Sequence, residues 1–199
     1  MVEKRDVRSF FDRLAPGWDA ETVRNEPVIA RILDNARVRE GCTVLDVACG
    51  TGVLFGDYIR RGAAQVTAID LSPEMAARAA AKTGGSPVTV LCGDVETDVR
   101  VRENAPYDVV MVYNALPHFP DPARLVRTLA GLVKAGGHLS IAHGMSRAAL
   151  DAHHSGCARD VSVGLLHEDE LKSLMAAYLD VDTVISDGEM YQVCGKKRA

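Results

Sequence analysis

Apolar residues along the chain follow two alternating spacings. Five short runs, nearly continuous in apolar and β-branched residues, predict buried strands at residues 43–47, 66–70, 88–91, 108–112 and 139–142. Stretches of helical period lie between these runs, from about residue 40 to residue 180. This alternation predicts an α/β fold with a parallel sheet and helices on both of its faces.

Two of the predicted helices carry local start and stop signals. Ser72 and Asp121 are predicted N-caps, and each precedes a proline that suits the first helical position. The helix after Asp121 is expected to end at Gly136 and Gly137, because glycine readily adopts the conformation that terminates helices. These signals place helices after the second and fourth strands.

Both ends of the chain depart from this repeat. Residues 1–39 precede the first strand with a helical pattern, and we expect them to form a lid over a core of residues 40–199 within one domain. Near the end, residues 181–186 and 190–194 flank an Asp-Gly turn signal. This arrangement predicts an antiparallel hairpin.

Composition restricts the class of protein without identifying it. The chain has 199 residues, 47% of them hydrophobic and 25% charged, as in ordinary globular domains. Its net charge of −4 provides no positive field to attract nucleic acid. No apolar run approaches the roughly 20 residues that span a bilayer, and the first residues lead into no signal-peptide core. We therefore expect a cytoplasmic protein without a nucleic-acid or membrane partner.

The cysteine pattern indicates reduced thiols. The number of cysteines is odd and no Cys-x-x-Cys pair occurs, which argues against a disulfide framework and a structural zinc site. Most of them are expected to be small buried hydrophobic residues. The five are Cys42, Cys49, Cys92, Cys157 and Cys194.

A glycine-rich turn follows the first predicted strand. Gly50 and Gly52 separate this strand from a helix expected from about Val53, and such a turn lets a ligand approach the backbone and the helix N-terminus. The turn alone is also consistent with close packing of strand and helix. Asp70 ends the second strand, where a doubly wound fold places a carboxylate that accepts ribose hydroxyl groups. The combination predicts a nucleotide-like ligand at the carboxyl edge of the sheet.

The spacing of this turn separates two families of nucleotide-binding proteins. A third spaced glycine, as in nicotinamide-binding enzymes, is missing after Gly52. Residues 46–52, which read Asp-Val-Ala-Cys-Gly-Thr-Gly, instead resemble motif I of the class I S-adenosylmethionine (SAM)-dependent methyltransferases. Ala48 stands where that motif often has a glycine.

Further segments resemble the same family. Residues 70–72, 93–95 and 113–116 resemble its motifs II, III and IV, and residues 132–137 resemble the turn before its fifth strand. Residues 10–19 resemble the entry segment of its quinone-methylase-like branch, where an aromatic residue closes over the cofactor. From this set of motifs the chain is identified as a member of the family. Residues 116–119 and 142–147, with His154 and Tyr191, resemble an uncharacterised prokaryotic subgroup within it.

The resemblance implies a fold, a cofactor and the residues that hold it. The seven-stranded sheet would have the order 3-2-1-4-5-7-6 with strand 7 antiparallel, in a Rossmann-like α/β fold. SAM would bind at the carboxyl edge, with Asp70 at the ribose hydroxyls. Trp18 also fits a packing role under an N-terminal helix. The expected cofactor-binding residues are Trp18, Asp46, Ala48, Cys49, Gly50, Thr51, Gly52, Asp70, Leu71, Met75, Gly93, Asp94, Val95 and Asn114.

Three histidines are predicted to face one pocket next to the cofactor. His118 follows the fourth strand and His143 the fifth, and the implied sheet places these strands side by side. His154 lies on a short predicted helix and is favoured over His153 as the third member. Two roles stay open: ligands of Zn²⁺ or another divalent ion, or a general base or hydrogen-bonding group for the substrate. A packing role also remains open for His118.

The motifs together predict a SAM-dependent methyltransferase for a small-molecule acceptor. The identity of the attacked atom, whether oxygen, sulfur, nitrogen or carbon, stays open. The alternative is a SAM-binding sensor or scaffold without methyl transfer, and a turnover assay separates the two. A nicotinamide-dependent oxidoreductase is disfavoured by the glycine spacing and by the terminal hairpin.

Overall fold

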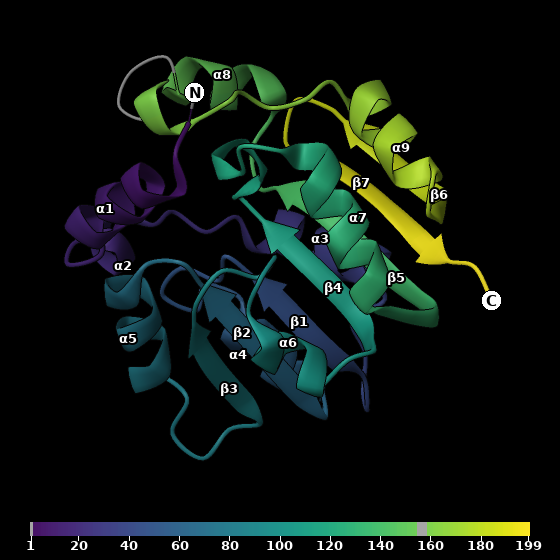
Figure 1. Cartoon of the computed structure of the whole chain (residues 1–199), viewed down its shortest axis with the longest axis horizontal. Coiled ribbons are helices and arrows are strands. Elements are labelled where there is room, and N and C mark those ends of the chain that lie inside the picture. Colours follow the sequence, from purple (N-terminus) through teal and green to yellow (C-terminus); the bar gives the residue numbers. More distant parts are fainter. Residues whose placement is uncertain (1, 155–158) are drawn as a thin grey trace.

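The computed structural model describes the backbone of residues 2–154 and 159–199, and the side chains of these residues except 151–154 and 159. Helices and strands alternate through most of the chain (Figure 1). The strands are β1 (Thr43–Val47), β2 (Gln65–Asp70), β3 (Val88–Cys92), β4 (Tyr107–Tyr113), β5 (Val133–His143), β6 (Leu179–Ser186) and β7 (Tyr191–Lys197). The helices are α1 (Lys4–Leu14), α2 (Trp18–Glu21), α3 (Glu26–Asn35), α4 (Phe55–Arg60), α5 (Pro73–Ala81), α6 (Val99–Glu103), α7 (Pro122–Leu132), α8 (Arg147–His154) and α9 (Glu168–Ala176), with 3-10 turns η1 (Leu116–His118) and η2 (Arg159–Val161).

The strands form a seven-stranded sheet in the order β3-β2-β1-β4-β5-β7-β6. Neighbours from β3 to β5 run parallel, whereas β7 is antiparallel to both β5 and β6. The expected strand order, the antiparallel seventh strand and the Rossmann-like α/β fold are therefore confirmed. The closing hairpin turns at Asp187, whose backbone N–H donates to the carbonyl of Met190 over 3.0 Å.

Alternate residues of the central strands face two separate apolar layers. Val44 and Met111 pack with α3 and α4 on one face of the sheet. Leu45 and Val110 pack with α7 and α9 on the other. Because successive side chains of a strand point to opposite faces, burial on both faces accounts for the nearly continuous apolar runs in the sequence.

Both predicted N-caps are confirmed. The hydroxyl oxygen of Ser72 accepts the N–H of Met75 over 3.1 Å, and a carboxylate oxygen of Asp121 accepts the N–H of Arg124 over 2.9 Å. Each cap satisfies a backbone donor that the first turn of its helix leaves unpaired. The helix after the glycine turn begins at Phe55, two residues later than expected.

The predicted end of α7 is wrong. The helix ends at Leu132 and β5 begins with the next residue, so that Gly136 and Gly137 lie inside the strand. The ladder between β4 and β5 is irregular at this point. A Cβ on Gly137 would lie 2.6 Å from the carbonyl oxygen of Asp108, so glycine here permits a close approach of two backbones.

The N-terminal segment divides into two parts. α3 packs against the sheet through Ile29, Ile32 and Leu33, which are buried. α1 and α2 lie instead beyond the carboxyl ends of the parallel strands, and the arrowheads of β1 and β3 point toward them (Figure 1). These two helices, together called the lid, cover the edge of the sheet where ligands bind in open α/β folds.

Four cysteines lie in the described part of the chain and are free thiols, three of them buried and Cys92 exposed. Cys157 lies outside the described residues. Within residues 2–154 and 159–199, no helix combines the length and apolar character needed to cross a bilayer.

Candidate functional site

A cavity of about 580 Å³ lies between the lid and the carboxyl ends of the strands. Its volume is in the range of sites for small-molecule ligands. Thr51 and Gly52 lie outside its wall, whereas the other expected cofactor-binding residues line it. These are Trp18, Asp46, Ala48, Cys49, Gly50, Asp70, Leu71, Met75, Gly93, Asp94, Val95 and Asn114.

Left-handed backbone conformations shape the loop after β1. The φ angles are 54° at Ala48, 57° at Gly50 and 84° at Gly52. Glycine adopts this region freely, whereas a residue with a Cβ is destabilised there by about 1 to 2 kcal/mol. Ala48 is such a residue. Gly52 packs directly against the ring of Phe55: if residue 52 carried a Cβ, that atom would lie 2.6 Å from the ring. Gly52 therefore serves the packing of the loop, while Gly50 faces the cavity.

Asp70, the last residue of β2, holds this loop in place. Its carboxylate accepts the N–H of Gly50 over 2.8 Å and the N–H of Ser72 over 2.9 Å. Burial raises the pKa of Asp70, and these two backbone donors partly oppose that shift. The carboxylate thus sits at the cavity wall with its position fixed by main-chain groups.

Asp46 supplies a second buried carboxyl to the wall. Among the described residues its Oδ2 atom and the hydroxyl of Tyr58 make no hydrogen bond of ordinary geometry, but the hydroxyl lies close enough to lower the pKa of the carboxyl. Burial raises the pKa of Asp46 to about 8, and the charge of Asp70 acts in the same direction. A buried polar atom without a partner is costly, so this carboxyl suits a ligand that brings a positive or donor group.

Carboxylates of the lid fasten it to the rest of the site. Asp12 of α1 accepts the hydroxyl of Ser72 over 2.5 Å, at the start of α5. Asp19 of α2 accepts the hydroxyl of Thr51 and, over 2.8 Å, the ammonium group of Lys82. Thr51 therefore holds the lid from outside the cavity wall.

Aromatic rings form the inner surface of the lid. The ring of Phe11 packs edge-to-face against Trp18, with centroids 5.7 Å apart, and against His118, with centroids 4.9 Å apart. All three residues line the cavity. Phe11 therefore joins the lid to the end of the cavity formed by η1.

His118 presents a defined face to the cavity. Its Nδ1 atom lies 2.8 Å from the carbonyl oxygen of Val161. Since a carbonyl oxygen can only accept a hydrogen bond, Nδ1 carries the proton in this contact. In the neutral form of the ring the basic lone pair then belongs to Nε2.

Comparison with known proteins agrees with this fold. A family model described as "Methyltransferase domain" matches residues 45–141, from the strand before the glycine loop to β5. The ubiquinone biosynthesis O-methyltransferase of Vibrio cholerae is 34% identical over 146 residues, which cover 69% of this chain and 59% of that protein. The chain belongs to the class I SAM-dependent methyltransferases. It spans about three-fifths of the length of the curated relatives it matches.

Solved structures share the fold of this methyltransferase. A chain from the complex of the Haloferax volcanii Trm112 methyltransferase activator with a methyltransferase aligns with a TM-score of 0.79 and 20% identity, over 97% of this chain and 98% of that one. The N-methyltransferase NodS from Bradyrhizobium japonicum, in complex with S-adenosylhomocysteine (SAH), aligns with a TM-score of 0.74 and 14% identity, over 96% and 98% of the chains. At these identities the likeness concerns the fold.

The other two predicted histidines occupy different places in the methyltransferase. His143 is fully buried outside the cavity wall, and its ring packs edge-to-face on Tyr191 with centroids 6.1 Å apart. His154 belongs to α8, and its side chain lies outside the described residues. Among the described side chains no group of three histidines, cysteines or carboxylates is arranged to hold a metal ion. The shared pocket of three histidines and the divalent metal stay predictions.

The motifs did not point to the charged residues that the lid and its neighbouring loops add to the wall. Among the described residues three cations line the cavity, and each pairs with at least one carboxylate. The pairs are Lys4 with Asp94 and Glu96, Arg8 with Asp12, and Arg24 with Glu26 and Asp57. The far end of the wall adds Tyr113, Met145 and Leu150.

Proposed function

We propose that this methyltransferase transfers a methyl group from SAM to a hydroxyl oxygen of an uncharged small molecule. The observation that carries the proposal is the presence, in one cavity wall, of the loop held by Asp70 and of His118 with its basic nitrogen on Nε2. The curated relatives named as ubiquinone biosynthesis O-methyltransferases support oxygen as the attacked atom. When bound, SAM supplies an electrophilic methyl group.

The residues present fit this cofactor. Asp70 would accept the ribose hydroxyls, and Asp94 and Val95 would face the adenine. Asp46, whose buried Oδ2 lacks a partner among the described residues, would receive the amino group of the methionine part. Trp18 and Phe11 would cover the cofactor and exclude water, which strengthens these polar contacts.

His118 would act as the general base. Its Nδ1 donates to the carbonyl of Val161, which orients the ring, and Nε2 would take the proton of the acceptor hydroxyl. The contact with Phe11 would couple this orientation to a closed lid. The remaining work of the protein is alignment of the acceptor with the methyl group, which lowers the entropic part of the barrier.

The charges of the wall favour an uncharged acceptor. Each of the three lining cations faces a carboxylate of the chain, so a carboxylate or phosphate on the acceptor would have to compete with that carboxylate for its cation. Leaving a buried charge unpaired costs at least about 1 to 3 kcal/mol, or roughly 5- to 150-fold in binding. Phe119, Met145 and Leu150 add apolar surface that suits an aromatic or alkyl body.

Labelled methyl transfer to matched acceptors tests the proposal. With labelled SAM, a neutral phenol such as catechol should react with a kcat/KM at least about fivefold above that of its carboxylated counterpart, 3,4-dihydroxybenzoate. Equal or faster transfer to the carboxylated compound would contradict the assigned acceptor class. Tight SAM binding without transfer to any phenol, alcohol, thiol or amine would instead favour a sensor or scaffold.

Asp46 should make SAM binding depend on pH. In the ligand-free chain its pKa of about 8 keeps it largely protonated at pH 7, and the positive charge of SAM favours the ionised form. Binding should therefore release a proton, so that SAM affinity rises with pH up to about 8 and then levels off. Calorimetry at several pH values and in buffers of different ionisation enthalpy measures both effects.

The stability of the ligand-free chain should change in the opposite sense. The folded pKa of Asp46 lies above the ordinary value of 3.8. Its contribution to the free energy of unfolding is therefore fully present below pH 3.8 and is lost as the pH rises toward 8. Asp46→Asn removes the titrating group and should flatten both trends. A pH dependence of SAM affinity that is unchanged in this variant would rule out Asp46 as its source.

A further inference from the structure

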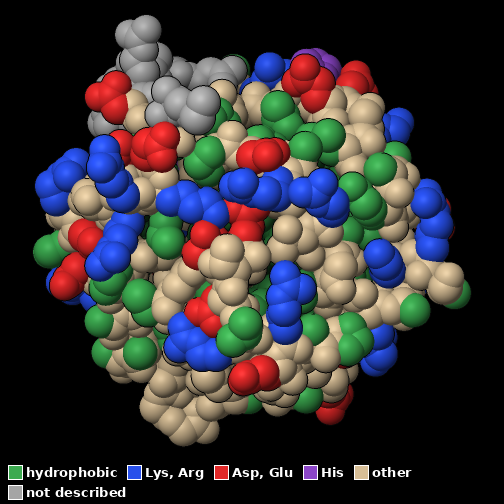
Figure 2. All heavy atoms as spheres, viewed as in Figure 1, with side chains coloured by type: hydrophobic (Ala, Val, Ile, Leu, Met, Phe, Trp, Pro, Cys, Tyr) green, Lys and Arg blue, Asp and Glu red, His purple; other side chains and the backbone are tan. Residues whose placement is uncertain are grey.

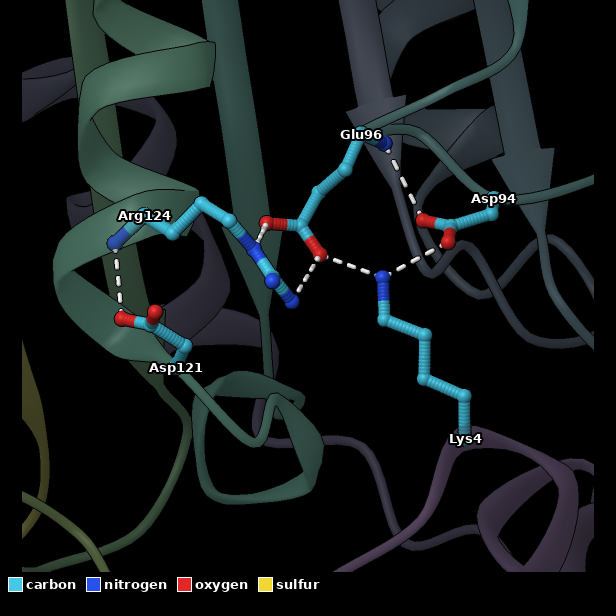
Figure 3. Close-up of polar contacts among 5 residues, drawn as sticks. All are labelled: Lys4, Asp94, Glu96, Asp121 and Arg124. Carbon is cyan, nitrogen blue, oxygen red and sulfur yellow. Dashed lines mark hydrogen bonds and ion pairs between the residues drawn. The ribbon is translucent and has the colours of Figure 1, made fainter.

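A four-residue ion-pair network joins the lid to two other parts of the fold (Figure 3). The ammonium group of Lys4, at the start of α1, lies 2.6 Å from a carboxylate oxygen of Asp94 and also contacts Glu96. Both oxygens of Glu96 bind Arg124 of α7, one over 2.8 Å to Nε and the other over 3.2 Å to Nη2. Glu96 therefore lies between a cation of the lid and a cation of the core.

The carboxylates of this network are held in place before the lid reaches them. The second oxygen of Asp94 accepts the backbone N–H of Glu96 over 3.0 Å, which fixes the two acids relative to each other. Arg124 binds both oxygens of Glu96 in a bidentate contact, a geometry that guanidinium groups favour. Asp121 caps the helix that carries Arg124 (Figure 3). Lys4 is thus the partner contributed by the lid.

The network is balanced in charge and partly shielded from solvent. It contains two cations and two carboxylates, and the Glu96 side chain is only 6% exposed. Burial lowers the pKa of Lys4, but the hydrogen bonds and charges of Asp94 and Glu96 outweigh it, so that the pKa is raised overall. Figure 2, which has the viewpoint of Figure 1, shows Lys and Arg side chains across the face of the molecule toward the viewer, with acidic side chains directly beside them. Such a contact is stronger than an isolated surface pair and still responds to salt.

The network reaches from the cavity wall to the core of the fold. Lys4 and Asp94 line the cavity, whereas Glu96 and Arg124 lie outside its wall. The other end of α1 is fastened through Asp12. Lys4 therefore closes the end of the cavity at Asp94, where the proposed function places the adenine.

We propose that Lys4 and Glu96 form a clamp that keeps α1 closed over the cofactor and sets how fast the cofactor product leaves. This inference rests on the proposed function of the cavity. Glu96 acts as a positioning residue, because it touches Lys4 and not the cavity. Arg124 in turn positions Glu96. Lid opening, which in many enzymes limits turnover, then requires the separation of Lys4 from two carboxylates.

Release of SAH from the full chain tests the clamp. Trp18 is the one tryptophan of the sequence and lines the cavity, so its fluorescence reports displacement of SAH in a stopped-flow chase. Glu96→Gln keeps the shape and removes the charge, and Lys4→Met does the same on the lid. Glu96→Gln should accelerate release roughly tenfold, the effect of losing one charge-assisted contact. Lys4→Met also loses the contact with Asp94 and should accelerate release by at least as much. The double variant should be little faster than Lys4→Met alone, because Lys4→Met already removes the contact that Glu96→Gln weakens.

The exposed helical residue Arg5 provides the matched control. Arg5 pairs with Asp6 of its own helix, so Arg5→Met removes a lid charge without touching the clamp. It should release SAH at the wild-type rate. The rate of SAH release from Arg124→Met should lie between the rates of Arg5→Met and Glu96→Gln, because Glu96 is still present but no longer held by Arg124. In the wild type, release should accelerate with ionic strength, and this dependence should be weaker in Lys4→Met.

Hydrogen exchange and thermal unfolding separate the clamp from general destabilisation. Glu96→Gln should raise amide exchange in residues 4–14 of SAH-bound protein while the core strands and the melting temperature stay close to wild type. Wild-type release rates in both Glu96→Gln and Lys4→Met, or equal acceleration in Arg5→Met, would overturn the clamp. Absence of SAM and SAH binding in the wild-type chain would contradict the proposed function itself, whereas binding with unchanged release rates in the variants would contradict only the clamp.

Discussion

His118→Asn should reduce the turnover number for methyl transfer by about 10²- to 10⁴-fold, the usual contribution of a general base. Asparagine is the informative replacement, because its side-chain amide can still donate to the carbonyl of Val161 as Nδ1 does. It offers no basic nitrogen in place of Nε2. The cofactor contacts at Asp70 and the glycine loop stay intact, so SAM affinity should remain within about twofold. This is the pattern of an interaction that serves the transition state rather than binding.

His167→Asn is the matched control for that variant. His167 caps α9 through Nδ1, which accepts the N–H of Asp169 over 3.3 Å, and it is not part of the cavity wall. Asparagine is a favourable N-cap, so stability and turnover should both stay near wild type. Steady-state kinetics with labelled SAM and calorimetry of SAM binding give both quantities. Turnover in His118→Asn within a few fold of the control would exclude His118 as the base.

Asp70→Asn should weaken SAM binding by about 1.5 to 3 kcal/mol, or roughly 10- to 150-fold, the range for losing hydrogen bonds to a charged group. Two effects act together in this variant. An amide is a weaker acceptor for the ribose hydroxyls, and its NH₂ group cannot accept the N–H donated by Gly50 or Ser72. The glycine loop would therefore also lose an anchor.

Calorimetry against a second aspartate variant distinguishes this effect from a general change in charge. Asp180 is paired with Arg198 at the far end of the sheet, away from the cavity wall. Asp180→Asn should bind SAM with wild-type affinity. An unchanged affinity in Asp70→Asn would mean that the ribose lies elsewhere.

The sequence predicted the sheet and much of the cavity because their signals are local. Strands buried on both faces must be apolar at nearly every position, which made the runs around Val44 and Val110 visible. Ser72 and Asp121 were identifiable because an N-cap acts within three residues. Asp70 was identifiable because the loop it holds and the strand it ends lie in a fixed order along the chain.

The lid contacts could not be predicted in the same way. Lys4 meets Asp94, which is 90 residues away, and Asp12 meets Ser72, which is 60 residues away. In sequence Lys4 and Asp12 look like ordinary residues on the exposed face of a helix. Their partners are decided by how α1 crosses the edge of the sheet, which no short pattern encodes.

Gly136 and His143 show a second limit of sequence reasoning. A glycine pair after an apolar helix normally marks a helix end, but here β5 begins before the pair, which lies in the irregular part of its ladder with β4. At Gly137 the close approach of the β4 backbone decides the role of the glycine. A histidine at the end of a strand is expected at the open edge. His143 is fully buried, and its ring packs edge-to-face on Tyr191 of the neighbouring strand β7.

The structure of the chain crystallised with SAH tests the central claim most directly. We predict SAH in the cavity under α1 and α2, with both ribose hydroxyls on the carboxylate of Asp70, the adenine beside Asp94 and Lys4, and the sulfur facing the end of the wall that carries His118. A binding mode in which SAH lies outside this cavity, or in which its ribose makes no contact with Asp70, would contradict this assignment.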